Sequence, residues 1–264
     1  MMRYLRLVKY FMLSSAQEDL AYRANFFIGL LHSLLNLIVG VLGLMVLFGQ
    51  VKTVNGWSFA ATLALLGVYL VVSALRGLFI GPSLEALAGM EGDIWSGRFD
   101  FVLLRPIDTQ FLVSLRQWRW FALIDLALGV GVLGVAVTQL GQALSVGQVI
   151  AFLGTMFASV AVLYAILLIF TALVFWGPGM LFTWVFDAIF QLARYPIGVY
   201  PGWLQFALTW IIPVAVLTTI PAQALTGDIT PGVLLASMTL AALLLIGASV
   251  LFRVGLRRYK SASS

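Results

Sequence analysis

Residues 149–175, VIAFLGTMFASVAVLYAILLIFTALVF, carry no charged side chain over their whole length. A helix needs about 20 mostly apolar residues to cross a bilayer, so this stretch predicts a transmembrane helix. The whole chain is similar in character, because 62% of its 264 residues are hydrophobic and 9% are charged. Soluble domains carry roughly 25% charged residues, and a soluble fold of this size could not hide so much apolar surface from water. The sequence therefore predicts an all-α integral membrane protein.

Outward from this stretch, four other runs are long and apolar enough to cross a membrane. They are residues 26–48, 57–80, 120–137 and 233–252. Two more stretches are ambiguous. Residues 180–193 are few and include Asp187, whereas residues 203–220 include Pro213 and are followed by Pro221. If both crossed the membrane, the chain would have seven spans and its termini would lie on opposite sides.

The distribution of basic residues argues against seven spans. They gather before the first span, in the loop after the second and after the last: Arg3, Arg6, Lys9 and Arg23; Arg98, Arg105, Arg116 and Arg119; Arg253, Arg257, Arg258 and Lys260. The loop 49–56 carries only Lys52, and the loop 138–148 carries no charge. The positive-inside rule then predicts that both termini and the loop 81–119 are cytoplasmic, which requires an even number of crossings. Six is the simplest number.

Six spans leave one ambiguous stretch to enter the membrane and turn back. We assign this role to residues 203–220, because proline-broken backbone is tolerated at membrane depth where protein or a watery cavity surrounds it. Residues 180–195 then form a short fifth span, from which Arg194 can reach the outer surface. The predicted external re-entrant region covers residues 196–231, and its four prolines are Pro196, Pro201, Pro213 and Pro221.

The N-terminal segment and the overall organisation follow from the same patterns. Residues 1–25 predict an amphipathic helix on the inner membrane surface, with Leu5 and Val8 on one side and Arg3 and Arg6 on another. A plain soluble extension is the alternative. No internal repeat, linker or second domain is evident, so residues 1–264 are expected to form a single transmembrane domain.

Three charged residues fall inside predicted spans, namely Arg76, Asp125 and Asp187. Arg76 and Asp125 are each expected about 6–8 Å inside the inner boundary at 1.5 Å per residue, so we predict that they pair. The alternative is that each reaches the surface separately. We expect Asp187 to face protein or a cavity, since an acid against hydrocarbon is costly. A role in a substrate path and simple packing against polar groups are both open.

Catalytic and cofactor motifs are not found. None of the three lysines lies in a glycine-rich phosphate-binding loop, the chain has no cysteine, and His32 is its only histidine. His32 is expected to be a hydrogen-bonded helix residue rather than a metal ligand, and no base is placed to activate Ser83. The basic residues are too few and scattered for a nucleic-acid surface. We therefore expect no enzyme activity, no cofactor and no nucleic-acid partner.

The segment 82–110 is too rich in large side chains for a simple turn between two spans. Its charged residues include Glu91, Asp93, Arg98, Asp100 and Arg105, and its large apolar residues include Trp95, Phe99 and Phe101. Aromatic anchors mixed with charges that fix register are typical of a docking surface. The alternative is a loop that lies on lipid headgroups.

Two motifs resemble the ABC-2 type permeases, and within them the six-span permeases that are separate subunits. The first is residues 91–100, EGDIWSGRFD, running into residues 103–106, LLRP; the second is residues 194–196, RYP, then residues 200–205, YPGWLQ, then Pro213 and Pro221. The first resembles the cytoplasmic segment that contacts the ATPase, and the second resembles the external re-entrant hairpin. The resemblance covers nearly the whole chain.

This resemblance implies a permease subunit of an ATP-driven exporter in the bacterial cytoplasmic membrane. ATP would be bound by a separate ABC ATPase subunit, and a second permease copy or a related permease would complete the pathway. The substrate is expected to be hydrophobic or amphipathic. One alternative is an ion-coupled secondary carrier acting through Asp125, Asp187, Arg76 or His32, although internal repeats and midplane ion ligands are not evident. Another is a substrate-binding membrane module, which would not need the charged loop.

Overall fold

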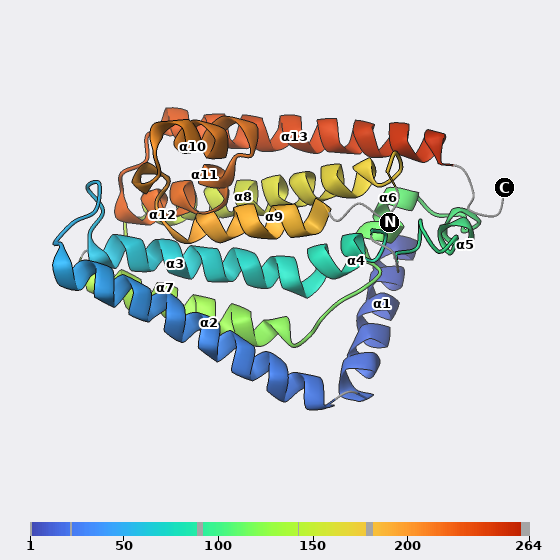
Figure 1. Cartoon of the computed structure of the whole chain (residues 1–264), viewed down its shortest axis with the longest axis horizontal. Helices are drawn as coiled ribbons and strands as arrows, with labels where there is room; N and C mark the ends of the chain where they lie inside the picture. The colour runs from blue at the N-terminus through green and yellow to red at the C-terminus, as the bar shows by residue number, and fades with distance from the viewer. Residues whose placement is uncertain (1, 22, 89–91, 142, 178–181, 260–264) are drawn as a thin grey trace.

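The computed structural model describes residues 2–21, 23–88, 92–141, 143–177 and 182–259. Within these ranges the regular elements are helices, and β pairing is limited to an isolated bridge between Val54 and Trp57. Figure 1 shows a long bundle whose main helices run close to its long axis. The predicted all-α class is confirmed.

Five helices in the described residues are long and apolar enough to cross a membrane. They are α2 (Arg23–Gln50), α3 (Phe59–Leu75) with its continuation to Glu85, α7 (Ala122–Gln139), α8 (Val146–Leu173) and α13 (Pro231–Arg258). Each covers most of one of the five clear apolar runs in the sequence. The continuation of α3 consists of a π-helix, η1 (Arg76–Ile80), and a short helix, α4 (Gly81–Glu85).

Polar caps determine where three of these helices begin. Ser58 accepts a hydrogen bond from a backbone N–H three residues into α3, and Thr230 does the same for α13. Ser145 and Gln148 form a reciprocal capping box at the start of α8. These caps satisfy N–H groups that have no partner within the first helical turn.

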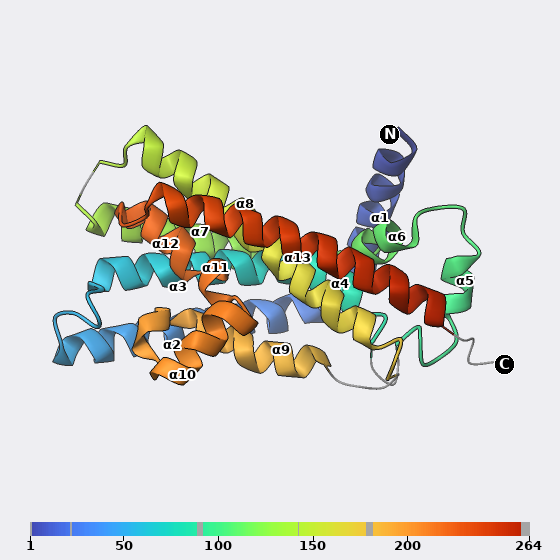
Figure 2. The ribbon, with the colours of Figure 1, turned by 90° about the horizontal axis from the view of Figure 1, so that it is seen from above.

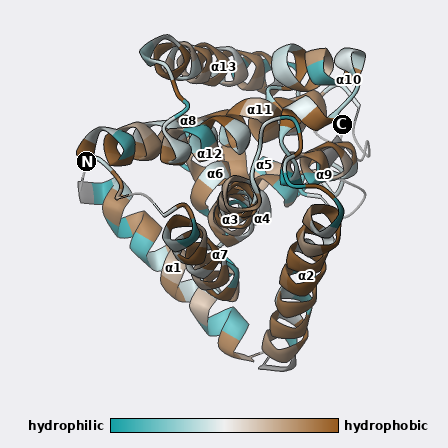
Figure 3. Cartoon of the chain, turned by 90° about the vertical axis from the view of Figure 1, so that its left-hand side faces the viewer, coloured by the Kyte–Doolittle hydropathy of each residue, from teal (hydrophilic) through white to brown (hydrophobic). Residues whose placement is uncertain are grey.

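Two helices form the centre of the bundle. In an apolar 18-residue stretch of each span, the buried share is 67% for the span that begins with α3 and 56% for α8, against 11% for α2 and 17% for α13. Figure 3, seen from one end, places α3 near the centre and α2 at the periphery, with apolar residues around most of α2. A peripheral helix that is apolar on all sides must face lipid or another protein.

Glycines allow α3 and α7 to pack with their backbones almost in contact. A Cβ atom on Gly67 would lie 2.9 Å from the backbone nitrogen of Leu133, and one on Gly129 would lie 2.8 Å from that of Val71. Real Cβ atoms do not approach backbone so closely, so glycine is needed at both positions. Small residues of this kind are typical of helix interfaces in membranes.

The region between α8 and α13 is a series of short helices. They are α9 (Phe182–Gln191), η2 (Leu192–Arg194), η3 (Ile197–Val199), α10 (Gly202–Phe206), η4 (Ala207–Ile211), α11 (Val214–Leu217) and α12 (Thr219–Thr226). Met180 and Leu181, which begin the predicted fifth span, lie outside the described residues. The described part of that span is helical over about 20 Å at 1.5 Å per residue, which is less than the roughly 30 Å hydrocarbon core.

Prolines mark the interruptions in this region. Pro196, Pro201 and Pro213 each directly precede a helix, and Pro221 lies in the first turn of α12. These are the positions where a missing N–H is tolerated. The chain therefore breaks at Pro213, as the sequence predicts, whereas entry of this region into a membrane stays a prediction.

The two ends of the bundle have different contents. One end holds α1 (Met2–Ala21), α5 (Phe99–Leu103), α6 (Thr109–Leu115) and the end of α13, and α10, α11 and α12 lie towards the other. Figures 1 and 2 both show α1 lying across the long axis of the bundle. The N-terminal segment is helical, as predicted, and its position on a membrane surface stays a prediction.

The contact at Gly129 generates a stability prediction. Gly129→Ala places a methyl group against the backbone of α3 and is expected to destabilise the protein by about 1–3 kcal/mol, as overpacked cores do. Gly134→Ala in the same helix is the matched control, because its Cβ would meet nothing within 4 Å. Thermal unfolding of the purified protein in detergent measures both. Equal midpoints for the two variants would contradict close packing of α3 on α7.

Candidate functional site

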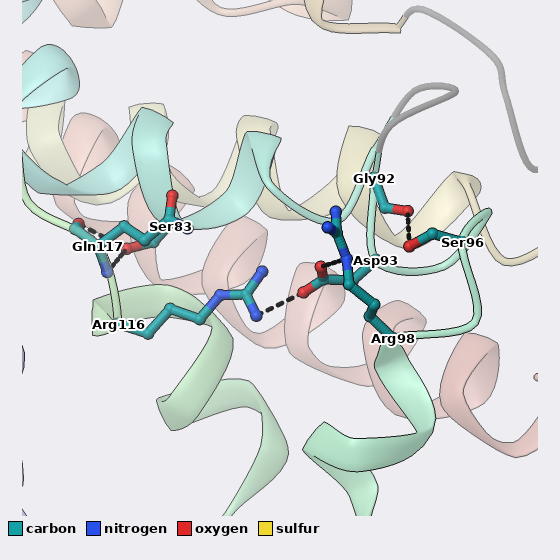
Figure 4. A network of polar contacts seen from close by, with 7 residues as sticks. All are labelled: Ser83, Gly92, Asp93, Ser96, Arg98, Arg116 and Gln117. Carbon is teal, nitrogen blue, oxygen red and sulfur yellow. Dashed lines mark hydrogen bonds and ion pairs between the residues drawn. The ribbon is translucent and has the colours of Figure 1, made fainter.

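Residues 86–121 connect α4 to α7, and we call this connection the inter-span segment. It is fixed to α4 by Ser83, whose side chain is fully buried. The Ser83 hydroxyl donates to the carbonyl oxygen of Gln117 at 2.9 Å and accepts from the Gln117 N–H at 3.0 Å (Figure 4). The end of the segment therefore cannot move without α4.

An internal ion pair holds the middle of the inter-span segment. Asp93 is 8% exposed, and its carboxylate contacts Arg116 Nη1 at 2.5 Å and Arg98 Nε at 3.1 Å (Figure 4). The Nε and Nη2 atoms of Arg116 are buried without a hydrogen-bond partner among the described residues. Asp93 is therefore the counter-charge of Arg116. Its burial leaves Asp93 inside the segment rather than on its surface, and the predicted docking role of this residue stays a prediction.

Phe99 is a core residue rather than an exposed anchor. Its side chain is 0% exposed, and its ring lies 5.6 Å from that of Phe175 and 5.1 Å from that of Tyr259. Phe252 packs on Phe175 at 5.6 Å, so this aromatic cluster joins α5 to the ends of α8 and α13. Phe99 is therefore not exposed as the expected anchor would be, and its contact with a partner stays a prediction.

The same cluster brings Tyr259 close to Asp100. Burial raises the pKa of Tyr259 to about 12, and the Asp100 carboxylate adds to the shift. The hydroxyl therefore stays protonated at neutral pH. Asp100, which the sequence predicts as a docking charge, lies next to the end of α13.

The outer face of the segment is apolar and exposed. Phe101 is 69% exposed and Leu104 is 79% exposed, and they lie three residues apart at the end of α5, on one face. Arg105 follows them and is also exposed, and we call these three residues the α5 ridge. Trp95, in the loop before α5, is 53% exposed. Of the predicted docking residues, Trp95, Phe101, Arg98 and Arg105 are thus accessible, and Glu91 lies outside the described residues.

The first helix is bound to the far part of the inter-span segment. Ser15 Oγ accepts from the Trp118 N–H at 3.1 Å, and Asp19 Oδ2 accepts from the Trp120 N–H at 2.8 Å. Trp120 Nε1 also donates to the carbonyl oxygen of Met12 at 3.1 Å. Sequence reasoning missed the roles of Ser15 and Asp19, because nothing along the chain relates them to residues a hundred positions away.

Arg76 lies at the first position of the π-helix and bridges two segments. Its Nη2 contacts Glu85 Oε1 at 2.8 Å, its Nη1 pairs with Asp187 on α9, and its guanidinium lies 5.1 Å from the centre of the Phe186 ring. The described residues contain no ion pair between Arg76 and Asp125, so the predicted pairing of these two is wrong. The prediction relied on the equal depth of the two residues in the membrane, but depth does not determine the direction in which a side chain points around its helix. π-Helical turns are frequent at functional sites.

A polar cavity of about 170 Å³ lies inside the bundle. Its polar lining comes from five elements: His32, Ser33 and Asn36 of α2, Tyr69 and Ser73 of α3, Asp125 of α7, Gln191 of α9 and Arg194 of η2. Arg194 Nη2 donates to Asn36 Oδ1 at 3.2 Å. The expectation that Arg194 reaches the outer surface is therefore wrong. Among the described residues no three His, Cys, Asp or Glu side chains gather as a metal site.

Comparison with known proteins gives one family. The sequence model of a family described as ABC-2 family transporter protein matches residues 34–263. No curated protein and no solved structure matches the chain. The matched region includes the inter-span segment, the proline-interrupted helices and all of the polar cavity's lining except His32 and Ser33.

The ion pair inside the inter-span segment generates a double-variant prediction. Asp93→Asn leaves the Arg116 charge buried and is expected to cost about 3–5 kcal/mol of stability, as breaking a buried pair does. Replacing both, as Asp93→Leu with Arg116→Leu, should recover most of that loss. Limited proteolysis between α4 and α7 and thermal unfolding measure the effect. If Asp93→Asn is as stable as the parent, the ion pair does not hold the segment.

Proposed function

The chain belongs to the ABC-2 transporter family, and we propose that it is the membrane-spanning permease of an ATP-binding-cassette exporter. It is a multi-pass membrane protein, and membrane components of this family generally work with an ABC ATPase. The proposed ATPase is a separate cytoplasmic subunit that binds and hydrolyses ATP, while this chain forms the path in the bacterial cytoplasmic membrane. The single observation that carries the proposal is the α5 ridge, an exposed apolar surface on a segment fixed to the bundle.

The α5 ridge has the properties that a docking surface for an ATPase requires. Transmission of movement needs a contact that stays bound while both proteins shift, and buried aromatic side chains supply most of the energy of such contacts. Phe101 and Leu104 can supply that apolar area, and Arg105 adds a charge that steers association. A loop that merely rests on headgroups would not need buried connections on its other side.

Those buried connections distribute movement of the segment to several spans. Ser83 links it to α4, and the Phe99 cluster links it to α8 and α13. Gln110 Nε2 donates to Tyr164 Oη of α8 at 3.2 Å and to Ser249 Oγ of α13 at 3.0 Å. A displacement of the ridge would therefore move α4, α8 and α13 together, which supports its role in coupling.

We propose six crossings with both termini in the cytoplasm. The fifth crossing would consist of α9 and η2, an extended residue at Tyr195 and the short helix η3, because Asn55, in the loop before α3, donates to the carbonyl oxygen of Gly198. The chain thus reaches the α2–α3 loop four residues after Arg194. The helices α10 to α12 would then form the external re-entrant hairpin, broken at Pro213.

A second copy, or a related permease, would complete the translocation path. The exposed and mostly apolar surface of α2 supports this proposal, because either another helix or lipid could cover it. An ion-coupled carrier is the second candidate, and the observation that favours it is the presence of His32 and Asp125 in the same cavity. Transport that needs an ion gradient and no ATPase would support the carrier.

The coupling proposal predicts the effect of removing the apolar side chains of the α5 ridge. Phe101→Ala with Leu104→Ala should weaken association with the ATPase by about 30-fold, the equivalent of a 2 kcal/mol hot spot, without changing membrane insertion. Phe157→Ala is a matched control, because Phe157 is 71% exposed but lies on α8 away from the ridge. Co-purification with the ATPase and substrate-stimulated ATP hydrolysis measure the effect. Normal binding and transport by the ridge variant would rule the ridge out as the docking surface.

The topology is tested by cysteine labelling, which is straightforward because the chain has no cysteine of its own. A membrane-impermeant thiol reagent added outside should label cysteines placed at Lys52 and Asp228. It should not reach cysteines placed at Arg98 and Arg257 until the membrane is permeabilised. Labelling of positions 98 and 257 from opposite sides would refute six crossings.

A further inference from the structure

The polar cavity lies near mid-depth of the helical bundle. Tyr69 is ten residues after the start of α3 and sixteen before Glu85, which places it about 15 Å and 24 Å from these ends at 1.5 Å per residue. Asn36 is fourteen residues from the end of α2, or about 21 Å. Polar groups at such a depth have no bulk water and need partners within the protein or in a ligand.

Arg194 brings a positive charge to this cavity and leaves part of it unsatisfied. Its guanidinium donates to Asn36 and lies 5.1 Å from the centre of the Tyr69 ring. Its Nε atom is buried and has no hydrogen-bond partner among the described residues, and no described carboxylate pairs with it. Arginine at the centre of a span costs roughly 2.5–3.5 kcal/mol on insertion scales. An anionic group at this point would neutralise it.

Asp125 brings the opposite charge to the same cavity. Within the described residues it takes part in no ion pair and no hydrogen bond, so its carboxylate lies beyond the 4.0 Å ion-pair distance from Arg194. The cavity is thus lined by a cation and an anion that form no ion pair with each other or with another described residue. A ligand that carries both an anionic and a cationic group could therefore pair with Arg194 and Asp125 at the same time.

An apolar groove continues from the polar cavity. Leu37 and Leu128 line both, and the groove, of about 450 Å³, extends between α2, α3 and α7 past Val41 and Leu63 to Phe59. Phe59 begins α3, so the groove leads from mid-depth towards the end of the bundle that holds the α2–α3 loop. A ligand that fills both spaces would have a charged head and a hydrocarbon chain.

We propose that this site binds a zwitterionic amphiphile. Its anionic group, a phosphate or a carboxylate, contacts Arg194, its ammonium group contacts Asp125, and its chain occupies the apolar groove. A cavity of about 150 Å³ accommodates benzene, so 170 Å³ suits a small head group. A purely anionic head would leave Asp125 unpaired and repelled, and an uncharged head would leave both charges unpaired.

The inference rests on the proposed permease function in one respect, namely that the bound amphiphile is cargo. With the α2–α3 loop outside, the chain points outward and the head lies at mid-depth. An amphiphile of the inner leaflet has the same orientation, with its head on the cytoplasmic side of its chain. The site therefore fits a molecule taken from the inner leaflet whose head has moved part of the way across.

The test measures lipid retention by the purified full-length chain without any ATPase. Native mass spectrometry in detergent compares phosphatidylethanolamine, phosphatidylglycerol and diacylglycerol with the same acyl chains. The parent should retain the zwitterionic lipid at least tenfold better than the other two. Arg194→Gln should remove most of this retention, and Ala127→Phe, which fills the groove, should reduce retention of all three lipids.

Asp125→Asn gives the most specific readout. Removal of the carboxylate leaves Arg194 as the only charge in the cavity, so preference should shift from phosphatidylethanolamine to phosphatidylglycerol. A merely structural role of Asp125 would lower retention without reversing the preference. Lys52→Gln and Asp228→Asn are charge controls outside the cavity and should behave as the parent does.

The outcomes separate this inference from the proposed function. Equal retention of the three lipids by the parent, or unchanged preference in Asp125→Asn, would overturn the inference even if the ATPase still binds through the α5 ridge. Conversely, the variant Phe101→Ala with Leu104→Ala should bind the zwitterionic lipid normally. If the chain selects the zwitterionic lipid but associates with no ATPase, the lipid site is supported and the proposed exporter function is refuted.

Discussion

The absence of water from the hydrocarbon core is the constraint on which the rest of this structure depends. Backbone groups there must be paired within the chain, which explains why the long elements are helices and why serine and threonine cap their starts. The same constraint acts on charges. Arg76 is held between Glu85 and Asp187, whereas Arg194 and Asp125 line one cavity and form no ion pair within the described residues. The difference separates a structural cluster from a candidate binding site.

The inter-span segment is held rigidly on its inner side and exposes a surface for a partner protein on its outer side. Its inner side contains a fully buried phenylalanine, a buried ion pair and a serine that binds the backbone of Gln117. Its outer side exposes Phe101 and Leu104. Rigidity matters because a flexible loop would deform when the ATPase moves, whereas a rigid segment transmits that movement to α4, α8 and α13. The first helix adds to this rigidity through Ser15 and Asp19, which bind the backbone before α7.

The helical segment formed by α9 and η2 ends at Arg194, and this end lies at the polar cavity. A continuous helix would carry residue 194 along a regular surface, but here the helix ends at Arg194, Tyr195 is extended, and the chain then forms the short helix η3, where Gly198 meets Asn55. Broken helices in transporters commonly line binding sites, because irregular backbone is tolerated only next to protein or a cavity. Arg194, the last helical residue before the break, thus lies in the polar cavity.

The sequence by itself determined the class of the protein, the five clear spans, the breaks at proline and the composition of the inter-span segment. Each of these depends on local properties, namely apolar length, cap residues and missing N–H groups. Only the tertiary structure decided that Asp93 and Phe99 face inward while Phe101 faces outward, that Arg76 pairs with Asp187 instead of Asp125, and that Arg194 turns into a cavity. Hydropathy gives the depth of a residue along one axis. The partner of a side chain depends also on its direction around the helix, which a π-helical turn changes, and on which distant segment packs there.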